Sequence, residues 1–125
     1  MQPRLRLVVL LLGVFFALQG LGWLFAPARL AGSLGMPLLD GLGRSTQIGD
    51  FASFFLTAGV SMLLGAQPGR ARLLLFPAAL IGGAALTRTL AWLVQGADFA
   101  TLFIAVELAT AAVLATAARS LDRVP

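Results

Sequence analysis

The sequence predicts an all-α protein in which residues 1–125 form a single integral membrane domain, a bundle of four transmembrane helices. Two observations support this prediction. Hydrophobic residues make up 59% of the chain and charged residues only 11%, whereas soluble domains are about 45–50% apolar even with glycine included. The apolar residues also gather in four runs, each close to the ~20 residues that a helix needs to cross a bilayer.

The four runs are expected to span the membrane at residues 7–25, 48–66, 73–94 and 99–117. Pro77, one turn into the third run, should cause at most a bend, because neighbouring helices can satisfy the carbonyl group that it frees. A cleaved signal peptide is the alternative for the first run, since residues 26–28 resemble a small-residue cleavage site. The run has ~19 residues, which exceeds the 7–15 of a usual signal-peptide core, so a transmembrane helix is favoured.

The connection between the first two spans, residues 26–47, is too rich in polar residues, glycine and proline to cross a membrane. Pro27 suits the first turn of a helix, and the spacing of Leu30 and Leu34 places both on one side. We therefore expect a short helix lying at the membrane interface, followed by a turn at Asp40 and Gly41.

The distribution of arginine predicts the orientation. Six arginines fall on the side of the two chain ends, and only Arg29 and Arg44 fall on the other: the six are Arg4, Arg6, Arg70, Arg72, Arg119 and Arg123. Cytoplasmic segments of membrane proteins carry the excess of basic residues. Both termini are therefore expected in the cytoplasm, with Trp23 and Trp92 as anchors at the outer face of the membrane.

The residue types that are missing exclude much chemistry. The chain has no cysteine, histidine, lysine, tyrosine or asparagine. Structural zinc sites, His- or Cys-ligated haem, disulfides and nucleophiles activated by histidine are therefore excluded. We expect no cofactor, no metal and no catalytic residue. The net charge of +4 does not indicate nucleic-acid binding, because the arginines lie at the ends of apolar runs.

Three ionisable residues, Asp50, Arg88 and Glu107, lie within or at the edge of the spans. An ionisable side chain at mid-bilayer costs roughly 2.5–3.5 kcal/mol on insertion scales, so it normally faces the bundle interior and finds a partner. Counting residues from the outer helix ends places Arg88 and Glu107 about 10 Å deep, with Gln19 in the same layer and Asp50 somewhat shallower. We expect Arg88 between Glu107 and Asp50, with Gln19 hydrogen-bonding nearby.

Ser53, Thr57 and Ser61 follow Asp50 at spacings of three and four residues, which predicts a polar stripe that faces inward. Two interpretations of the whole cluster stay open. In the structural one, Arg88 and Glu107 lock two helices together and Asp50 caps the start of the second span. In the functional one, the cluster binds a ligand, because two carboxylates against one arginine leave a surplus negative charge.

Small residues at spacings of four predict close helix packing on the third span, at Ala78 with Gly82 and Ala79 with Gly83. The fourth span carries a similar series at Ala105, Ala109, Ala112 and Thr116. Such series suit a bundle and also suit assembly with itself or with other membrane subunits.

The layout resembles a family of uncharacterised bacterial membrane proteins, loosely akin to the DoxX-like four-helix proteins. The resemblance rests on residues 27–35 after the first span, Gly49-Asp50, Gly82-Gly83 with Arg88, and residues 106–108 with Glu107. It implies a four-helix inner-membrane protein and adds no activity, cofactor or catalytic residue.

Three classes of function follow. The favoured class is a non-enzymatic protein, either an accessory subunit or a binder of a lipid or lipophilic ligand; a subunit predicts an exposed seam rich in alanine and glycine, and a binder predicts a cavity containing Arg88 and Glu107. The alternative is a small oligomeric transporter in which Glu107 or Asp50 exchanges a proton. The third is an enzyme of lipid or isoprenoid chemistry with Glu107 as acid or base.

Overall fold

The computed structural model describes residues 3–120 and confirms the predicted all-α four-helix bundle. Its elements in chain order are α1 (Pro3–Phe25), α2 (Pro27–Ser33), α3 (Gly41–Gly65), the 3₁₀ helix η1 (Ala71–Leu74), α4 (Leu75–Gln95) and α5 (Thr101–Ser120). Four helical segments are long and apolar enough to cross a membrane, namely α1, α3, η1 with α4, and α5. The expected short helix in the first connection is α2.

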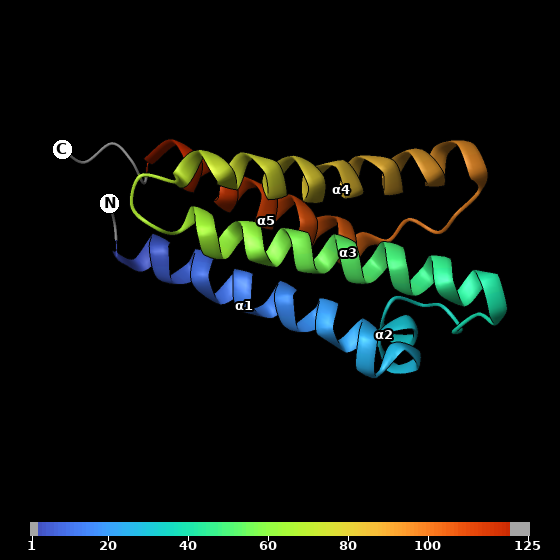
Figure 1. Ribbon diagram of the computed structural model, residues 1–125. Helices are drawn as coiled ribbons and strands as arrows, with labels where there is room; N and C mark the ends of the chain where they lie inside the picture. The colour runs from blue at the N-terminus through green and yellow to red at the C-terminus, as the bar shows by residue number, and fades with distance from the viewer. Residues whose placement is uncertain (1–2, 121–125) are drawn as a thin grey trace.

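The four long helices lie side by side and alternate in direction (Figure 1). The described ends of α1 and α5 lie at one end of the bundle together with the turn between α3 and η1, and we call this the terminal end. The opposite end carries α2 and the connection from α4 to α5, and we call it the α2 end. Helix α1 packs mainly on α3, and α4 mainly on α5, so the bundle consists of two helix pairs.

Helix α3 begins at Gly41, seven residues before the expected start of the second span at residue 48. Asp40 is its N-cap position, and the Arg44 side chain of the first turn pairs with the Asp40 carboxylate at 3.0 Å. The glycines and polar residues of this segment resemble a loop in the sequence, yet they form about two additional helical turns. Asp50 therefore lies inside α3 and does not cap it, which corrects that expectation.

Pro77 is the third residue of α4, and its side chain is fully buried. A proline in the first turn removes none of the hydrogen bonds made inside that helix, because the first amides have no partner there. The preceding turn of η1 joins α4 without a break, so the two together provide the third span.

The terminal half of the bundle is closed by one hydrophobic core. Every long helix and η1 contribute fully buried side chains to it, including Val9, Met62, Leu74 and Leu114. Because all four helices meet here, this half determines how the two helix pairs are joined.

The closest helix contact lies between α1 and α3. A Cβ atom on Gly59 would come within 2.8 Å of the Gly13 carbonyl oxygen and nearer still to the backbone of Ala17. Glycines at such a crossing let two backbones approach, as small residues do in membrane helix pairs. The small residues predicted for close packing on the third span behave differently: Gly83 has nothing within 4 Å of a Cβ position, and Gly82 has only an ordinary contact with Ala111.

The α2 end has a second, smaller core made by Trp23, Ala31 and Ala52. Trp23 is 0% exposed and stacks on Phe51 with ring centroids 4.8 Å apart, so the prediction that it faces the membrane interface is wrong. Helix α2 packs against α1, and its Ala31 belongs to the same buried cluster as this tryptophan. Trp92 is exposed near the end of α4 and packs edge-on against Phe99.

Buried Gln47 fixes the segment that joins α2 to α3. Its Oε1 accepts a hydrogen bond from the Leu39 backbone amide at 2.9 Å, and its Nε2 donates to the Pro37 carbonyl at 3.1 Å. This side chain holds the connection against the bundle, although nothing in the sequence singled it out from the polar residues around it.

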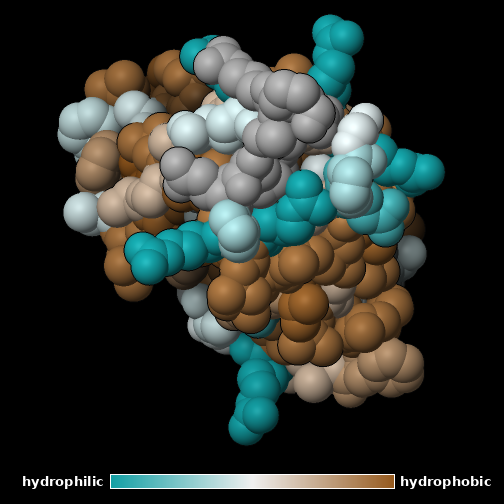
Figure 2. Space-filling view, turned by 90° about the vertical axis from the view of Figure 1, so that its left-hand side faces the viewer, coloured by the Kyte–Doolittle hydropathy of each residue, from teal (hydrophilic) through white to brown (hydrophobic). Residues whose placement is uncertain are grey.

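The bundle surface is apolar along its sides and polar at its terminal end. Figure 2 looks onto that end and shows hydrophilic side chains running across it and projecting from its edges, with hydrophobic side chains between and beside them. Exposed leucine, valine and phenylalanine side chains occur on all four long helices, among them Leu11, Val60, Leu86 and Leu108. A surface of this kind is expected where helices face lipid instead of water.

Candidate functional site

Arg88 and Glu107 form an ion pair between α4 and α5. The Nε atom of Arg88 lies 3.0 Å from Oε1 of Glu107 and donates a hydrogen bond of 3.3 Å to Oε2. The two side chains are 33% and 17% exposed, respectively. Both residues lie six or seven positions from the end of their helix at the α4–α5 connection, so both are about 10 Å deep in the bundle.

The guanidinium group of Arg88 is held on a second side by an aromatic ring. Its central carbon lies 4.7 Å from the centroid of Phe103, which is within the range of a cation–π contact. Phe103 and Glu107 are one helical turn apart on α5. The same side of α5 therefore contacts the guanidinium at its Nε atom, through Glu107, and over its planar surface, through Phe103. The guanidinium is therefore fixed in place while part of it stays free.

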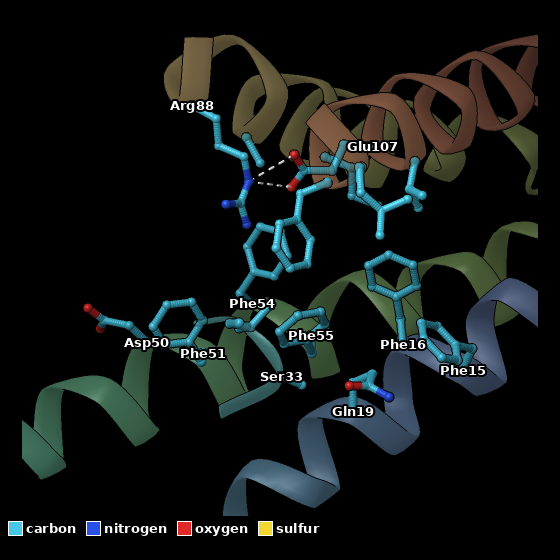
Figure 3. Close-up of a pocket in the computed structure, with 16 residues that line it drawn as sticks. Phe15, Phe16, Gln19, Ser33, Asp50, Phe51, Phe54, Phe55, Arg88 and Glu107 are labelled. Carbon is cyan, nitrogen blue, oxygen red and sulfur yellow. Dashed lines mark hydrogen bonds and ion pairs between the residues drawn. The ribbon is translucent and has the colours of Figure 1, made fainter. Parts of the chain in front are cut away.

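The free part is the pair of terminal nitrogens. A guanidinium has five N–H donors, and Nε supplies only one of them. Neither terminal nitrogen of Arg88 has a hydrogen-bond partner among residues 3–120. Figure 3 shows both nitrogens directed away from the Glu107 carboxylate.

These groups lie in a pocket of about 610 Å³ between the two helix pairs, in the part of the bundle toward the α2 end. Arg88 and Glu107 project from α4 and α5 on one side, and phenylalanine rings of α1 and α3 line the other (Figure 3). Six of the sixteen lining residues are phenylalanines: Phe15, Phe16, Phe51, Phe54, Phe55 and Phe103. The pocket is therefore an apolar chamber with one ion pair in its wall.

The structure brings four of the predicted polar residues to this pocket, since Gln19, Asp50, Arg88 and Glu107 all line it. The contacts differ from the expectation. Asp50 is exposed and, within residues 3–120, forms no ion pair, so Arg88 does not lie between two carboxylates. Gln19 lies on the opposite wall, without a side-chain hydrogen bond to another described residue.

The reason lies in the rotation of α3 about its axis. Phe51 and Phe54 are placed toward the pocket, and the intervening ring volume separates α3 from Arg88. Asp50 is one residue before Phe51, about 100° around the helix, so its carboxylate is directed to the rim.

Ser53 and Thr57 do not belong to the pocket. Both are exposed and neither lines it, so the prediction of a polar stripe that faces inward is wrong. The spacing correctly places them on one face of α3, but Ala52, Ala58 and Met62 occupy the buried face instead. A spacing of three and four residues defines a face and does not say which way it points.

The phenylalanine lining was not predicted from the sequence. Its signal was present, because Phe51, Phe54 and Phe55 recur at spacings of three and four on one face of α3. The polar residues predicted how deep in the bundle the pocket lies, but the phenylalanine rings form most of its wall.

Within residues 3–120, no group of three or more carboxylate, imidazole or thiolate side chains comes together in a way that could hold a metal ion. Comparison of the chain with protein-family models, with curated proteins and with solved structures gives no match. The resemblance to DoxX-like proteins stays an expectation, and the function must be argued from the pocket.

Proposed function

We propose that this protein is a non-enzymatic membrane protein that binds a lipid or another lipophilic molecule in the pocket between its two helix pairs. The observation that carries the proposal is the lining: six phenylalanines surround a single ion pair in a volume of about 610 Å³. Pockets of about 300–1,000 Å³ with apolar walls and a few fixed polar groups are typical of small-molecule sites.

The pocket also reaches the apolar surface of the bundle. Phe15 on α1 and Leu102 and Val106 on α5 line it and are exposed at the same time. In a membrane, such a wall is continuous with the hydrocarbon region. A molecule with an alkyl or isoprenoid chain can therefore place its polar end near Arg88 while its chain extends toward the lipid.

The test is to fill the pocket and to look for bound molecules that are retained on purification. Ala84 lines the pocket, so Ala84→Phe adds a ring to its interior, whereas Ala79→Phe on the exposed surface of the same helix, outside the pocket, is the matched control. Native mass spectrometry should find a defined small mass on the wild type and on Ala79→Phe, and a loss of that mass from Ala84→Phe. A folded wild type without any bound molecule, or equal binding by Ala84→Phe, contradicts the proposal.

The proposal includes a place and an orientation, with the protein in a bacterial inner membrane and both termini in the cytoplasm. The support is charge: Arg4, Arg6, Arg70, Arg72 and Arg119 belong to the terminal end. Arg123 is outside the described residues. The α2 end has Arg29 and Arg44, offset by Asp40 and Asp98. A green fluorescent protein fused to the carboxyl end should fluoresce and an alkaline phosphatase at the same place should be inactive; the reverse result contradicts the orientation.

A second candidate function, a subunit of a larger assembly or a homo-oligomer, is favoured by one further observation. Ala105, Ala109, Ala112 and Thr116 are exposed on α5 at helical spacing, which is the small-residue seam expected of a subunit. Gentle extraction followed by native mass spectrometry separates the two candidates. An assembly of fixed composition that Ala109→Leu dissociates supports the subunit, and a monomer with a bound small mass supports the binder.

A further inference from the structure

The pocket presents two terminal guanidinium nitrogens, with four unused N–H donors, in a mainly apolar chamber. The terminal nitrogens of Arg88 have no partner among the described residues, while Nε is bonded to Glu107 and the ring of Phe103 lies against the guanidinium face. Donors in such a setting gain more from a partner than donors in water do, because little else competes for them.

On this basis, and resting on the proposed function, we propose that the ligand carries an anionic oxygen group, a phosphate or a carboxylate, that binds the two terminal nitrogens of Arg88. The planar guanidinium edge formed by these two nitrogens matches two oxygens of such a group in a bidentate arrangement. A hydroxyl or amide headgroup offers a weaker match, because it provides one uncharged acceptor at a time.

Glu107 acts in this site as a positioning residue. By accepting from Nε it occupies one edge of the guanidinium, and Phe103 restricts one face. The edge that remains is the one directed away from the Glu107 carboxylate (Figure 3). An anion on that edge is therefore on the far side of the guanidinium from the carboxylate, which limits their repulsion.

The other carboxylate near the pocket does not occupy this edge. Asp50 is exposed at the rim, and its side chain is directed away from Arg88 in Figure 3. Gln19, on the opposite wall, presents an uncharged amide to the pocket. The pocket thus has one charged donor group, one uncharged amide and an apolar wall for a chain, which together describe an anionic amphiphile.

The experiment compares ligands that share a chain and differ in headgroup. Protein in dodecyl maltoside is titrated with dodecyl phosphate, with dodecanol and with inorganic phosphate, and binding is measured by native mass spectrometry. Dodecyl phosphate should bind about tenfold more tightly than dodecanol, as charge-assisted hydrogen bonds predict. Inorganic phosphate should compete only weakly, because it does not use the phenylalanine wall.

Variants assign the effect to Arg88. Arg88→Gln should remove the preference for dodecyl phosphate, and Arg88→Lys should keep part of it, since lysine has the charge without the planar edge. Glu107→Gln should keep the preference, because the glutamine oxygen can still accept from Nε. Arg44→Gln is the matched control, since Arg44 is an exposed arginine of α3 that pairs with Asp40 and does not line the pocket.

The outcomes separate the two proposals. Equal affinity of wild-type protein for dodecyl phosphate and dodecanol overturns the anionic headgroup and leaves the lipophilic ligand in place, and this comparison needs no variant to fold. Absence of binding by both amphiphiles overturns both proposals. Inorganic phosphate that binds as tightly as dodecyl phosphate, with a loss in Arg88→Gln, supports the anion site and assigns it to a free anion, which overturns the lipophilic ligand.

Discussion

The two halves of the bundle are built from the same four helices and differ in how the helix pairs meet. In the terminal half, α1, α3, α4, α5 and η1 all contribute to one core around Val9, Met62 and Leu114. In the other half, the small core of Trp23, Ala31 and Ala52 draws only on α1, α2, α3 and their connection, and α4 and α5 stand across the pocket. One half joins the pairs, and the other leaves a chamber between them.

The side chains explain the difference. In the closed half, small residues such as Ala58, Ala71 and Ala117 share one buried cluster with larger ones, so little space remains between the helices. At the pocket, large rings of α1 and α3 line one wall, and Phe16 and Phe55 of this helix pair meet with centroids 5.7 Å apart. These rings face the Arg88–Glu107 pair of α4 and α5 across the pocket (Figure 3). The closed half should therefore provide stability, and the open half should provide binding.

The largest effect should come from truncating the closed core. Leu114 is 0% exposed, and Leu114→Ala should lower the free energy of unfolding by about 2–5 kcal/mol, because a cavity replaces packed atoms. Leu102→Ala on the same helix, at a 72% exposed pocket position, is the matched control and should change it little. Unfolding in mixed micelles with increasing dodecyl sulfate measures both. Equal losses at the two positions contradict the division into a closed and an open half.

The second effect tests the α1–α3 contact on which the closed half depends. Gly59→Ala should destabilise the protein by about 1–3 kcal/mol, because its methyl group would meet the backbone of Ala17 and the helices must move apart. Gly83→Ala, where a Cβ has open space, should be neutral or stabilise by about 0.5–1 kcal/mol through helix propensity. The same unfolding measurement applies, and the prediction fails if the two variants behave alike.

The depth of each polar side chain in the bundle could be predicted from the sequence. Counting residues at ~1.5 Å per position gives the depth of a side chain, and this placed Gln19, Arg88 and Glu107 in one layer correctly. Arg88 and Glu107 could be matched because they lie at similar distances from one short connection. The four helices followed from hydropathy alone, which is the strongest signal in a membrane chain.

What could not be predicted was the rotation of each helix and the place where α3 begins. Rotation depends on which neighbour each face meets, so Ser53 and Thr57 were assigned to the wrong face although their spacing was read correctly. The start of α3 depends on tertiary contacts of Gln47 with the connection after α2, which favour helix in a segment that otherwise resembles a loop. The rotation depends on contacts between helices, and the start of α3 on contacts eight and ten residues away, so residue spacing within a segment reveals neither.

The third prediction concerns the ion pair in the open half. A double-mutant cycle with Arg88→Gln and Glu107→Gln should give a coupling free energy of about 0.5–2 kcal/mol, since polar contacts between membrane helices are modest and Arg88 is partly exposed. The matched cycle at Asp40 and Arg44, an exposed pair within one segment, should give a smaller coupling. A coupling free energy larger than the loss of stability caused by Leu114→Ala would make this ion pair the main interaction between α4 and α5, contrary to the comparison.

The smallest effect on global stability should come from Gln47, and its local effect should be large. Gln47→Ala removes the acceptor of the Leu39 amide and the donor to the Pro37 carbonyl, but water can reach this connection and replace them. The free energy of unfolding should fall by less than about 1 kcal/mol. Hydrogen exchange at the Leu39 amide should nevertheless become much faster, because that amide loses its protecting acceptor. Gln47→Glu keeps an acceptor for Leu39 and serves as the control, and unchanged exchange in Gln47→Ala would show that the rest of the open half, not this side chain, holds the connection in place.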